Sequence, residues 1–356
     1  NHLPNFFQSH SSGNSHQYKL DIEREMFLKL KYFPQHMQKT QFHSYANKEL
    51  CKGCQLCVKG KKLVLFITGL CPNKCYFCPL SEQKFQTDVI FANERPIKEL
   101  KEIIEEAKVS SARGAGITGG DPLAKFERTL EAIKLLKKEF KNFHIHLYTP
   151  LNLIDDNKLR LLEEAGLDEI RFHPDLDSDK LWEKLKLKTS MSKGIEIPVI
   201  PKKDIKKLID FAKDHVEFFN LNELEYADAK HNKLAELGYT TKDDYSYGIE
   251  GSETLALEIL EQFPNLNIHY CTAKLKDSVQ LMNRLKLRGQ NIKENFDILT
   301  SDSTLVRGSI KGENLEKLQQ FLSFKTKLEK DRLLCSRNNA KKYAKSLKKK
   351  GYKVEI

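Results

Sequence analysis

Three cysteines within eight residues, Cys71, Cys75 and Cys78, constrain this sequence more than any other feature. They are separated by three and then by two residues, and they follow the apolar run Leu63–Thr68 directly. Gly69 and Pro72 predict a turn between that run and the thiols. Thiolates are the ligands that zinc and iron–sulfur clusters prefer. Three ligands leave one position of a four-coordinate or four-iron site open, which indicates chemistry at the metal and not only a structural role.

A second triplet, Cys51, Cys54 and Cys57, precedes the first, so six of the eight cysteines fall within 28 residues. The N-terminal residues lack the apolar core of a secretory signal, and no apolar run approaches the roughly 20 residues that cross a bilayer. We therefore expect a cytoplasmic protein without a membrane partner, in which clustered cysteines are metal ligands and not disulfides. The second triplet suits either zinc or an auxiliary iron–sulfur cluster. Its fourth ligand must come from elsewhere, and Cys271, at the end of a predicted strand, is the best candidate.

Charge is distributed unevenly along the 356 residues. Residues 276–356 hold 20 Lys and Arg against 9 Asp and Glu, which accounts for the whole net charge of +11. A basic segment of this kind favours a polyanionic partner such as RNA, although a solvated lysine-rich helix gives the same composition. A zinc-bound RNA-binding or scaffold protein without catalytic activity is therefore one interpretation of the chain.

Short runs rich in Ile, Val, Phe and Tyr alternate with helical patterns from residue 63 onward, which predicts βαβ units and a parallel sheet. The expected strands are 63–68, 115–118, 145–149, 169–173, 195–200, 218–222 and 267–271. Helices are expected between them, one of them over 177–187, and a further helix is expected over 314–328. Spacing alone does not separate a partial (β/α) barrel from a doubly wound sheet. In a barrel the active residues lie at the carboxyl ends of the strands. Chemically unusual residues do follow these runs, among them the Cys71 loop, Gly119–Pro122 and Arg171–His173.

Four segments follow from these patterns. Residues 1–17 are expected to be disordered. Residues 18–62 form a cysteine-rich N-terminal extension, with a short helix predicted over 20–31. Residues 63–275 form the barrel core, and residues 276–356 form a small basic α+β domain.

The spacing Cys71-x3-Cys75-x2-Cys78 resembles that of the radical S-adenosylmethionine (SAM) superfamily, and Phe77 before the last cysteine is common there. Gly119-Gly120-Asp121-Pro122, after the next strand, is similar to the family's Gly-Gly-Glu-Pro motif, with Asp in place of Glu. The resemblance covers about residues 60–275, and within the superfamily it is closest to proteins related to pyruvate formate-lyase activating enzyme.

The resemblance implies a partial (β/α)6 TIM-like barrel and a specific chemistry. Cys71, Cys75 and Cys78 would bind a [4Fe–4S] cluster, and its fourth iron would bind SAM. Reductive cleavage would give a 5′-deoxyadenosyl radical that abstracts hydrogen from a substrate. A ferredoxin or flavodoxin would supply the electron, and the substrate would be a macromolecule, either a partner protein that receives a glycyl radical or an RNA.

Individual side chains have expected roles on this interpretation. Phe77, Gly119, Gly120, Asp121, Pro122 and Lys202 are the candidates for binding SAM. Gly119 and Gly120 are expected to let the backbone approach the methionine moiety of SAM closely. The alternative role for Asp121 is to cap a helix. Candidates for contact with substrate or for catalysis are Arg171, His173 and Cys271.

Overall fold

The computed structural model describes residues 37–356. The predictions of disorder over 1–17 and of a helix over 20–31 lie outside these residues. Within them, no helix is both long enough and apolar enough to cross a membrane.

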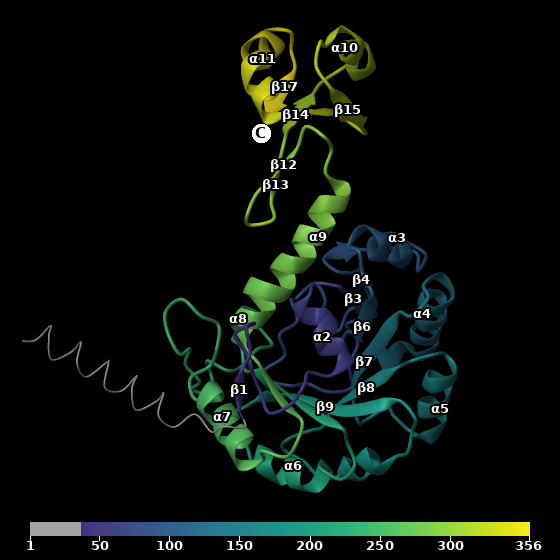
Figure 1. Ribbon diagram of the computed structural model, residues 1–356, viewed down its shortest axis with the longest axis vertical. Helices are drawn as coiled ribbons and strands as arrows, with labels where there is room; N and C mark the ends of the chain where they lie inside the picture. Colours follow the sequence, from purple (N-terminus) through teal and green to yellow (C-terminus); the bar gives the residue numbers. More distant parts are fainter. Residues whose placement is uncertain (1–36) are drawn as a thin grey trace, which may run out of the picture.

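Seven parallel strands form the centre of the molecule and lie side by side in chain order (Figure 1). They are β3 (Lys62–Phe66), β6 (Gly114–Thr118), β7 (His144–Pro150), β8 (Glu169–His173), β9 (Ser192–Val199), β10 (Phe218–Glu223) and β11 (Ile268–Cys271). Each coincides with one of the seven expected runs. A doubly wound sheet reverses its strand order at a switch point, whereas this order never reverses, so the curved sheet is of the barrel type.

The barrel is partial, because short antiparallel strands extend both edges of the sheet. β4 (Phe91–Ala92) and β5 (Arg95–Pro96) continue it beyond β3. β2 (Tyr45–Ala46) and β1 (Gln38–Lys39) continue it beyond β11. The predicted α/β fold with a partial barrel is confirmed, and β11 extends it by a seventh parallel strand.

Helices cover the outer face of the sheet in the order in which they connect its strands (Figure 1). They are α3 (Glu102–Val109), α4 (Phe126–Glu139), α5 (Asp156–Glu164), α6 (Ile205–Ala212) and α7 (Ser252–Gln262). Apolar stripes drive their packing, and Ile133 and Leu136 of α4 are fully buried. The helix expected over 177–187 is wrong in extent, because only the 3₁₀ turn Trp182–Lys186 forms there.

Helix α2 (Lys52–Val58), which carries Cys54 and Cys57, packs against the inner face of the sheet. In Figure 1 it lies inside the ring of strands. A Cβ atom on its Gly53 would stand 2.4 Å from Nη2 of Arg171 and 2.5 Å from Nδ1 of His146, so only glycine allows the helix to approach β7 and β8 this closely.

A helical arm leads out of the barrel after β11. It consists of α8 (Ala273–Leu275), the π-helix Lys276–Leu281 and α9 (Met282–Ile292). Two arginines hold α9 against the barrel: Arg284 pairs with Glu94, and Arg288 donates to Glu106, with Nε 3.1 Å from the carboxylate. The hairpin β12 (Ile298–Leu299) and β13 (Leu305–Val306) follows.

The chain ends in a small α+β unit at the far end of the arm (Figure 1). Its elements are β14 (Gly308–Lys311), α10 (Leu315–Phe321), β15 (Thr326–Glu329), β16 (Arg332–Cys335), α11 (Arg337–Lys349) and β17 (Lys353–Glu355). The sheet order is β15-β16-β14-β17 and all pairs are antiparallel, which is the ferredoxin-like βαββαβ arrangement. The helix expected over 314–328 is wrong in its second half, because residues 326–329 form the strand β15.

We predict that Leu136→Ala lowers the free energy of unfolding by about 2 to 5 kcal/mol, because it opens a cavity between α4 and the sheet. Chemical denaturation followed by circular dichroism measures this. Lys134→Ala, on the exposed side of the same helix, should change stability by less than about 0.5 kcal/mol. Equal losses in both variants would contradict the assigned orientation of α4.

Candidate functional site

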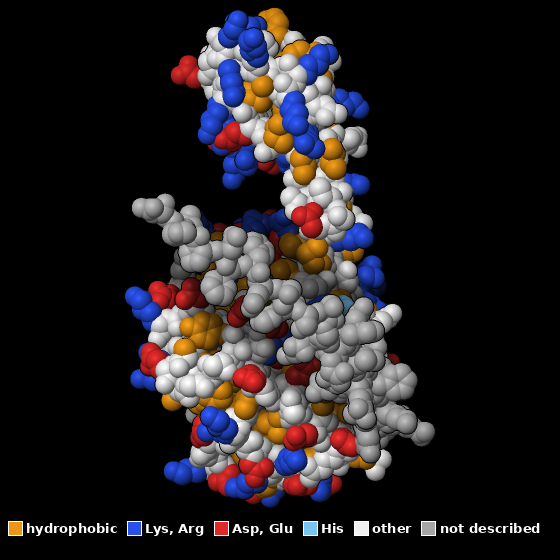
Figure 2. Space-filling model, turned by 90° about the vertical axis from the view of Figure 1, so that its left-hand side faces the viewer, with side chains coloured by type: hydrophobic (Ala, Val, Ile, Leu, Met, Phe, Trp, Pro, Cys, Tyr) orange, Lys and Arg blue, Asp and Glu red, His pale blue; other side chains and the backbone are white. Residues whose placement is uncertain are grey.

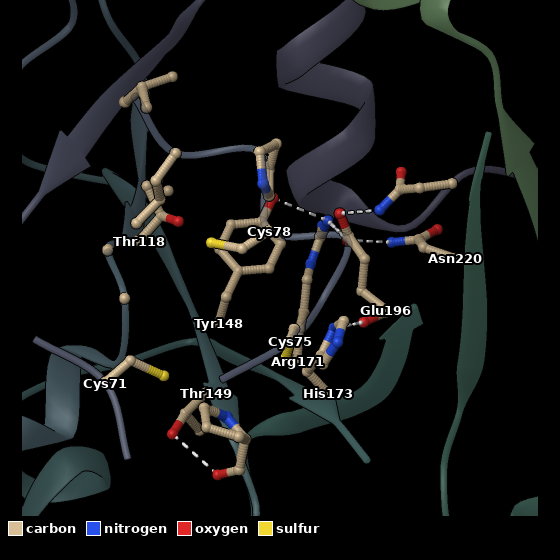
Figure 3. Close-up of a pocket in the computed structure, with 18 of the residues that line it drawn as sticks. Cys71, Cys75, Cys78, Thr118, Tyr148, Thr149, Arg171, His173, Glu196 and Asn220 are labelled. Carbon is tan, nitrogen blue, oxygen red and sulfur yellow. Dashed lines mark hydrogen bonds and ion pairs between the residues drawn. The ribbon is translucent and has the colours of Figure 1, made fainter. Parts of the chain in front are cut away.

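A cavity of about 470 Å³ opens inside the barrel and is lined by both cysteine-bearing segments. The loop after β3 contributes Cys71, Cys75 and Cys78, and α2 contributes Cys54 and Cys57. Figure 3 shows the thiols of the loop beside side chains from β6, β7, β8, β9 and β10. Two motifs that the sequence suggested separately therefore open onto one space.

The loop that carries Cys71 is fixed at its base by Gly69. Its N–H donates to the carbonyl of Thr87 at 2.8 Å, and its carbonyl accepts from the N–H of Gln86 at 3.0 Å. A Cβ atom on Gly69 would stand 1.6 Å from the carbonyl oxygen of Lys84, so no other residue fits. Gln86 also donates through Nε2 to the carbonyl of Cys71 at 2.9 Å. These contacts close the loop on itself and hold its thiols toward the cavity.

The thiols of this loop are half-buried. Burial raises the pKa of Cys71 to about 11 and that of Cys75 to about 12. Binding of a metal would therefore displace protons from them. Among residues 37–356, no three His, Cys, Asp or Glu side chains stand close enough together to hold one ion. Three features of the site suit an iron–sulfur cluster: the thiol donors, the cavity that they share, and the close backbone contacts at Gly119 and Gly120.

Gly119 and Gly120 bring the end of β6 against the start of this loop. The N–H of Gly120 donates to the carbonyl of Thr68, and the N–H of Asp121 donates to that of Leu70, both at 2.8 Å. A Cβ on Gly119 would stand 2.4 Å from the Thr68 oxygen, and one on Gly120 would stand 2.5 Å from the Leu70 oxygen. The close approach that requires these glycines in the structure is thus to the cysteine loop itself. Both glycines also line the cavity.

Asp121 is fully buried and caps the 3₁₀ helix Pro122–Lys125. Its Oδ1 accepts from the N–H of Leu123 at 3.0 Å and from the hydroxyl of Thr149 at 2.9 Å, while Oδ2 has no partner. Burial raises the pKa of this carboxyl to about 6. The cap that we considered as an alternative role is therefore present, and the orphaned oxygen leaves capacity for one more donor. Asp121 and Pro122 lie behind the cavity lining and are not part of it.

Phe77 and His173 face each other across the cavity wall, with ring centroids 6.1 Å apart. Nδ1 of His173 stands 2.9 Å from the carbonyl oxygen of Glu196. Because a carbonyl only accepts, Nδ1 carries the proton and Nε2 is an acceptor. Burial lowers the pKa of His173, which keeps the ring neutral. Lys202 lies elsewhere, with its ammonium 5.4 Å from the ring centre of Tyr239, and does not line the cavity.

Arg171 is the most heavily partnered side chain of the cavity and is 1% exposed. Its guanidinium forms ion pairs with Glu169 and, at 2.6 Å, with Glu196. It also donates to the hydroxyl of Tyr148 at 3.3 Å and to Sγ of Cys51 at 3.2 Å. Figure 3 shows Arg171 beside Tyr148 and Glu196. The positive charge predicted at this strand end is present, but it is paired with carboxylates of the protein and contacts Cys51 of the second triplet.

Cysteines of the second triplet and Cys271 lie at the inner side of the sheet, around the same cavity. Cys54, Cys57 and Cys271 all line the cavity, and Cys51 adjoins it through Arg171. Side-chain amides point at these sulfurs, since Asn220 Nδ2 lies 3.8 Å from Cys51 and Gln280 Nε2 lies 3.8 Å from Cys271. Cys271 thus opens onto the same cavity as Cys54 and Cys57, but among residues 37–356 no three such side chains are close enough to hold one ion, so its role as the fourth ligand stays a prediction. Cys335 is buried in the C-terminal unit, away from both groups.

Several lining residues escaped the sequence analysis: Lys62, Thr118, Glu196, Asn220, Lys276 and Gln280. Most occupy alternate positions within strands, and such positions share one face of a sheet. That alternation was the available signal, because Glu196 and Asn220 are polar residues in otherwise apolar runs. Lys276 and Gln280 come from the π-helix, which no pattern in the sequence predicted.

Comparison with known proteins assigns the chain to a family. A sequence model described as the radical SAM superfamily matches residues 65–220, from β3 to β10. A protein of Methanocaldococcus jannaschii named "putative glycyl-radical enzyme activating enzyme" is 43% identical over 287 residues, which are 77% of this chain and 76% of that protein. The chain belongs to the radical SAM superfamily. It is therefore an enzyme that uses a [4Fe–4S] cluster and SAM, and the non-catalytic zinc-binding alternative is wrong.

Other similarities are narrower. Biotin synthase of Pasteurella multocida is 31% identical over 103 residues, which are 28% of this chain and 30% of that enzyme. The crystal structure of methylornithine synthase aligns with a TM-score of 0.38 at 16% identity, over 58% of this chain and 63% of that one. The radical SAM methyltransferase TsrM from Kitasatospora setae aligns with a TM-score of 0.37 at 12% identity, over 68% and 54%. The assignment rests on the sequence matches.

We predict that Gly120→Ala lowers the iron bound after anaerobic reconstitution, because the added methyl group forces the backbone of Leu70 away and displaces the loop of Cys71. Iron per chain and the visible absorbance of the cluster measure this. Ser81→Ala, an exposed change in the same loop, should leave both unchanged. Full iron content in Gly120→Ala would show that the glycine contact does not hold the loop.

A second prediction concerns Arg171. Arg171→Met should lower the free energy of unfolding by about 3 to 5 kcal/mol, because it leaves the carboxylates of Glu169 and Glu196 buried without their cation. The double variant Arg171→Met/Glu196→Gln should recover part of that loss. Arg160→Met, which breaks only exposed contacts with Glu164 and Asn157, should have little effect in the same denaturation experiment.

Proposed function

We propose that Cys71, Cys75 and Cys78 bind the [4Fe–4S] cluster and that SAM occupies the part of the cavity beside Gly119 and Gly120. The observation that carries this proposal is the joining of the two motifs. The cysteine loop and the glycine segment line one cavity and are linked by backbone hydrogen bonds from Gly120 and Asp121. When bound, the cluster and SAM supply a 5′-deoxyadenosyl radical that abstracts hydrogen from a substrate.

The chain's own residues position and shield these groups. The Phe77 ring, packed edge-on against Tyr76 with centroids 5.1 Å apart, covers the loop of thiols on the side of His173. Nε2 of the neutral His173 offers an acceptor for a hydroxyl or amino group of SAM or substrate. Tyr148 and Thr149 complete the wall at the end of β7. Because the cavity lies inside the barrel, a radical formed there is held away from bulk water.

Cys51, Cys54 and Cys57 with Cys271 form, on this proposal, the site of an auxiliary iron–sulfur cluster. Four thiols would close the site, in contrast to the open triplet of the Cys71 loop. The N–H groups of Arg171, Asn220 and Gln280 that point at Cys51 and Cys271 are donors that would stabilise thiolate charge. Zinc fits the same ligand set, and metal analysis separates the two.

The substrate is proposed to be a macromolecule, with a ferredoxin or flavodoxin as electron donor. The name of the M. jannaschii relative supports a partner protein that receives a glycyl radical. The basic region 276–356 supports RNA. A finer assignment of the chemical outcome does not follow from the cavity residues.

The experiment that tests this proposal is anaerobic reconstitution followed by analysis of metal and SAM products. Wild-type protein should hold two clusters' worth of iron and release 5′-deoxyadenosine from SAM in the presence of dithionite. Replacement of Cys71, Cys75 and Cys78 by Ala should abolish the product and halve the iron. Replacement of Cys51, Cys54 and Cys57 by Ala should also halve the iron while SAM cleavage persists. Intact clusters without SAM cleavage would refute the proposed SAM site, and zinc in place of half the iron would refute the auxiliary cluster.

A further inference from the structure

The last part of the chain carries a run of positive charge that the barrel chemistry does not use. Residues 332–354 contain no Asp or Glu and nine Lys and Arg. Seven of these cations belong to α11 and its C-terminal cap, and all seven are exposed: Arg337, Lys341, Lys342, Lys345, Lys348, Lys349 and Lys350. In the part of the chain that the structure describes, none of the seven forms an ion pair, although the neighbouring Arg332 and Lys353 do.

From this surface we infer that the exposed side of α11, the α11 face, binds the phosphate backbone of RNA. Blue Lys and Arg side chains gather over the C-terminal unit in Figure 2. Unpaired lysines that repel one another along one helix lower its stability, and phosphate groups relieve that repulsion. The 13 residues of α11 extend about 20 Å, which is enough to follow several phosphates.

The other side of α11 argues against insertion of this helix into a membrane. Ala340 and Leu347 are buried, and they pack with Tyr343 into the core formed with Ile310 and Leu333. The apolar stripe of the helix is therefore already used by its own domain. An interfacial membrane helix needs a free apolar face to enter the acyl region, and α11 has none to offer.

The sheet of the domain indicates which kind of recognition to expect. RNA-binding domains with this βαββαβ order stack bases on aromatic side chains of the open sheet face. The four strands here contain no aromatic residue. On the open face, Lys311 pairs with Glu355 and Lys327 pairs with Glu294, so those charges are neutralised. Recognition should therefore run through phosphates on the helix side, with strong salt dependence and little preference for sequence.

The arm connects this surface with the cavity. Lys276 and Gln280 line the cavity from the π-helix, and the same helical arm continues through α9 to the basic domain. Ion pairs of Arg284 and Arg288 fix α9 to the barrel, and the chain passes from α9 through the hairpin β12–β13 to the domain of α11. RNA is preferred to duplex DNA because loops of folded RNA present unpaired nucleotides, which chemistry on a base requires. That preference rests on the proposed function, whereas binding of a phosphate backbone does not.

The test is fluorescence anisotropy of labelled transfer RNA with the anaerobically purified full-length protein, titrated at several salt concentrations. The triple variant Lys341→Gln/Lys345→Gln/Lys348→Gln removes three exposed charges while glutamine preserves helix propensity. It should weaken binding at least about tenfold and reduce the slope of log K against log salt by about 2 to 3. Lys134→Gln/Lys138→Gln/Lys141→Gln removes the same charge from the barrel and should bind RNA as the wild type does.

Each result decides the inference. Equal loss in both triple variants, or binding by wild type and the α11 variant with the same salt slope, would overturn it. Competition by polyglutamate as strong as that by unlabelled transfer RNA would assign the α11 face to an acidic protein instead. Tighter binding to duplex DNA than to transfer RNA would overturn the choice of RNA. Circular dichroism and thermal unfolding verify that the variants fold. Since no readout depends on SAM cleavage, RNA binding by a protein that fails to cleave SAM would refute only the proposed function.

Discussion

Backbone contact between the end of β6 and the start of the cysteine loop is the constraint on which the site depends. Two hydrogen bonds, from Gly120 to Thr68 and from Asp121 to Leu70, leave no space for a side chain at either glycine. Thr68 lies two residues beyond the end of β3, so the sheet fixes the position of the loop. The thiols are thereby placed by the register of two neighbouring parallel strands, and any ligand that spans both motifs binds a preformed corner of the barrel.

Arg171 performs a comparable task deeper in the cavity. Its single positive charge is shared by Glu169 and Glu196, and it reaches Cys51 as well. The guanidinium thus joins β8, β9 and the segment before α2. Arg171 thus ties the Cys51 end of α2 to the sheet, while its predicted contact with substrate stays a prediction.

Much of this architecture could be predicted from the sequence, because the relevant signals are local. Most parallel strands are short runs rich in β-branched or aromatic residues, and the residues after β3 and β6 are recognisable by their type and spacing. Contacts between distant segments left no such signal. The glycines at 119 and 120 were expected to admit a ligand, yet the atoms nearest to their missing side chains belong to Thr68 and Leu70. Lys202 was predicted to bind SAM because it follows a strand, but its ammonium lies over the ring of Tyr239. The helix expected over 314–328 failed because Thr326–Glu329 gains more from pairing with Arg332–Cys335 than from local propensity.

The helical arm has a further consequence, which concerns reach. From Ala273 to Ile292 the chain is continuously helical, and at 1.5 Å per residue its two ends are roughly 30 Å apart. One end forms part of the cavity wall and the other carries the basic domain. The length of the arm therefore sets the distance between the cavity wall and the start of the basic domain. A metabolite that fills the cavity is too short to touch the far domain, whereas a partner that engages both must itself extend over about that length.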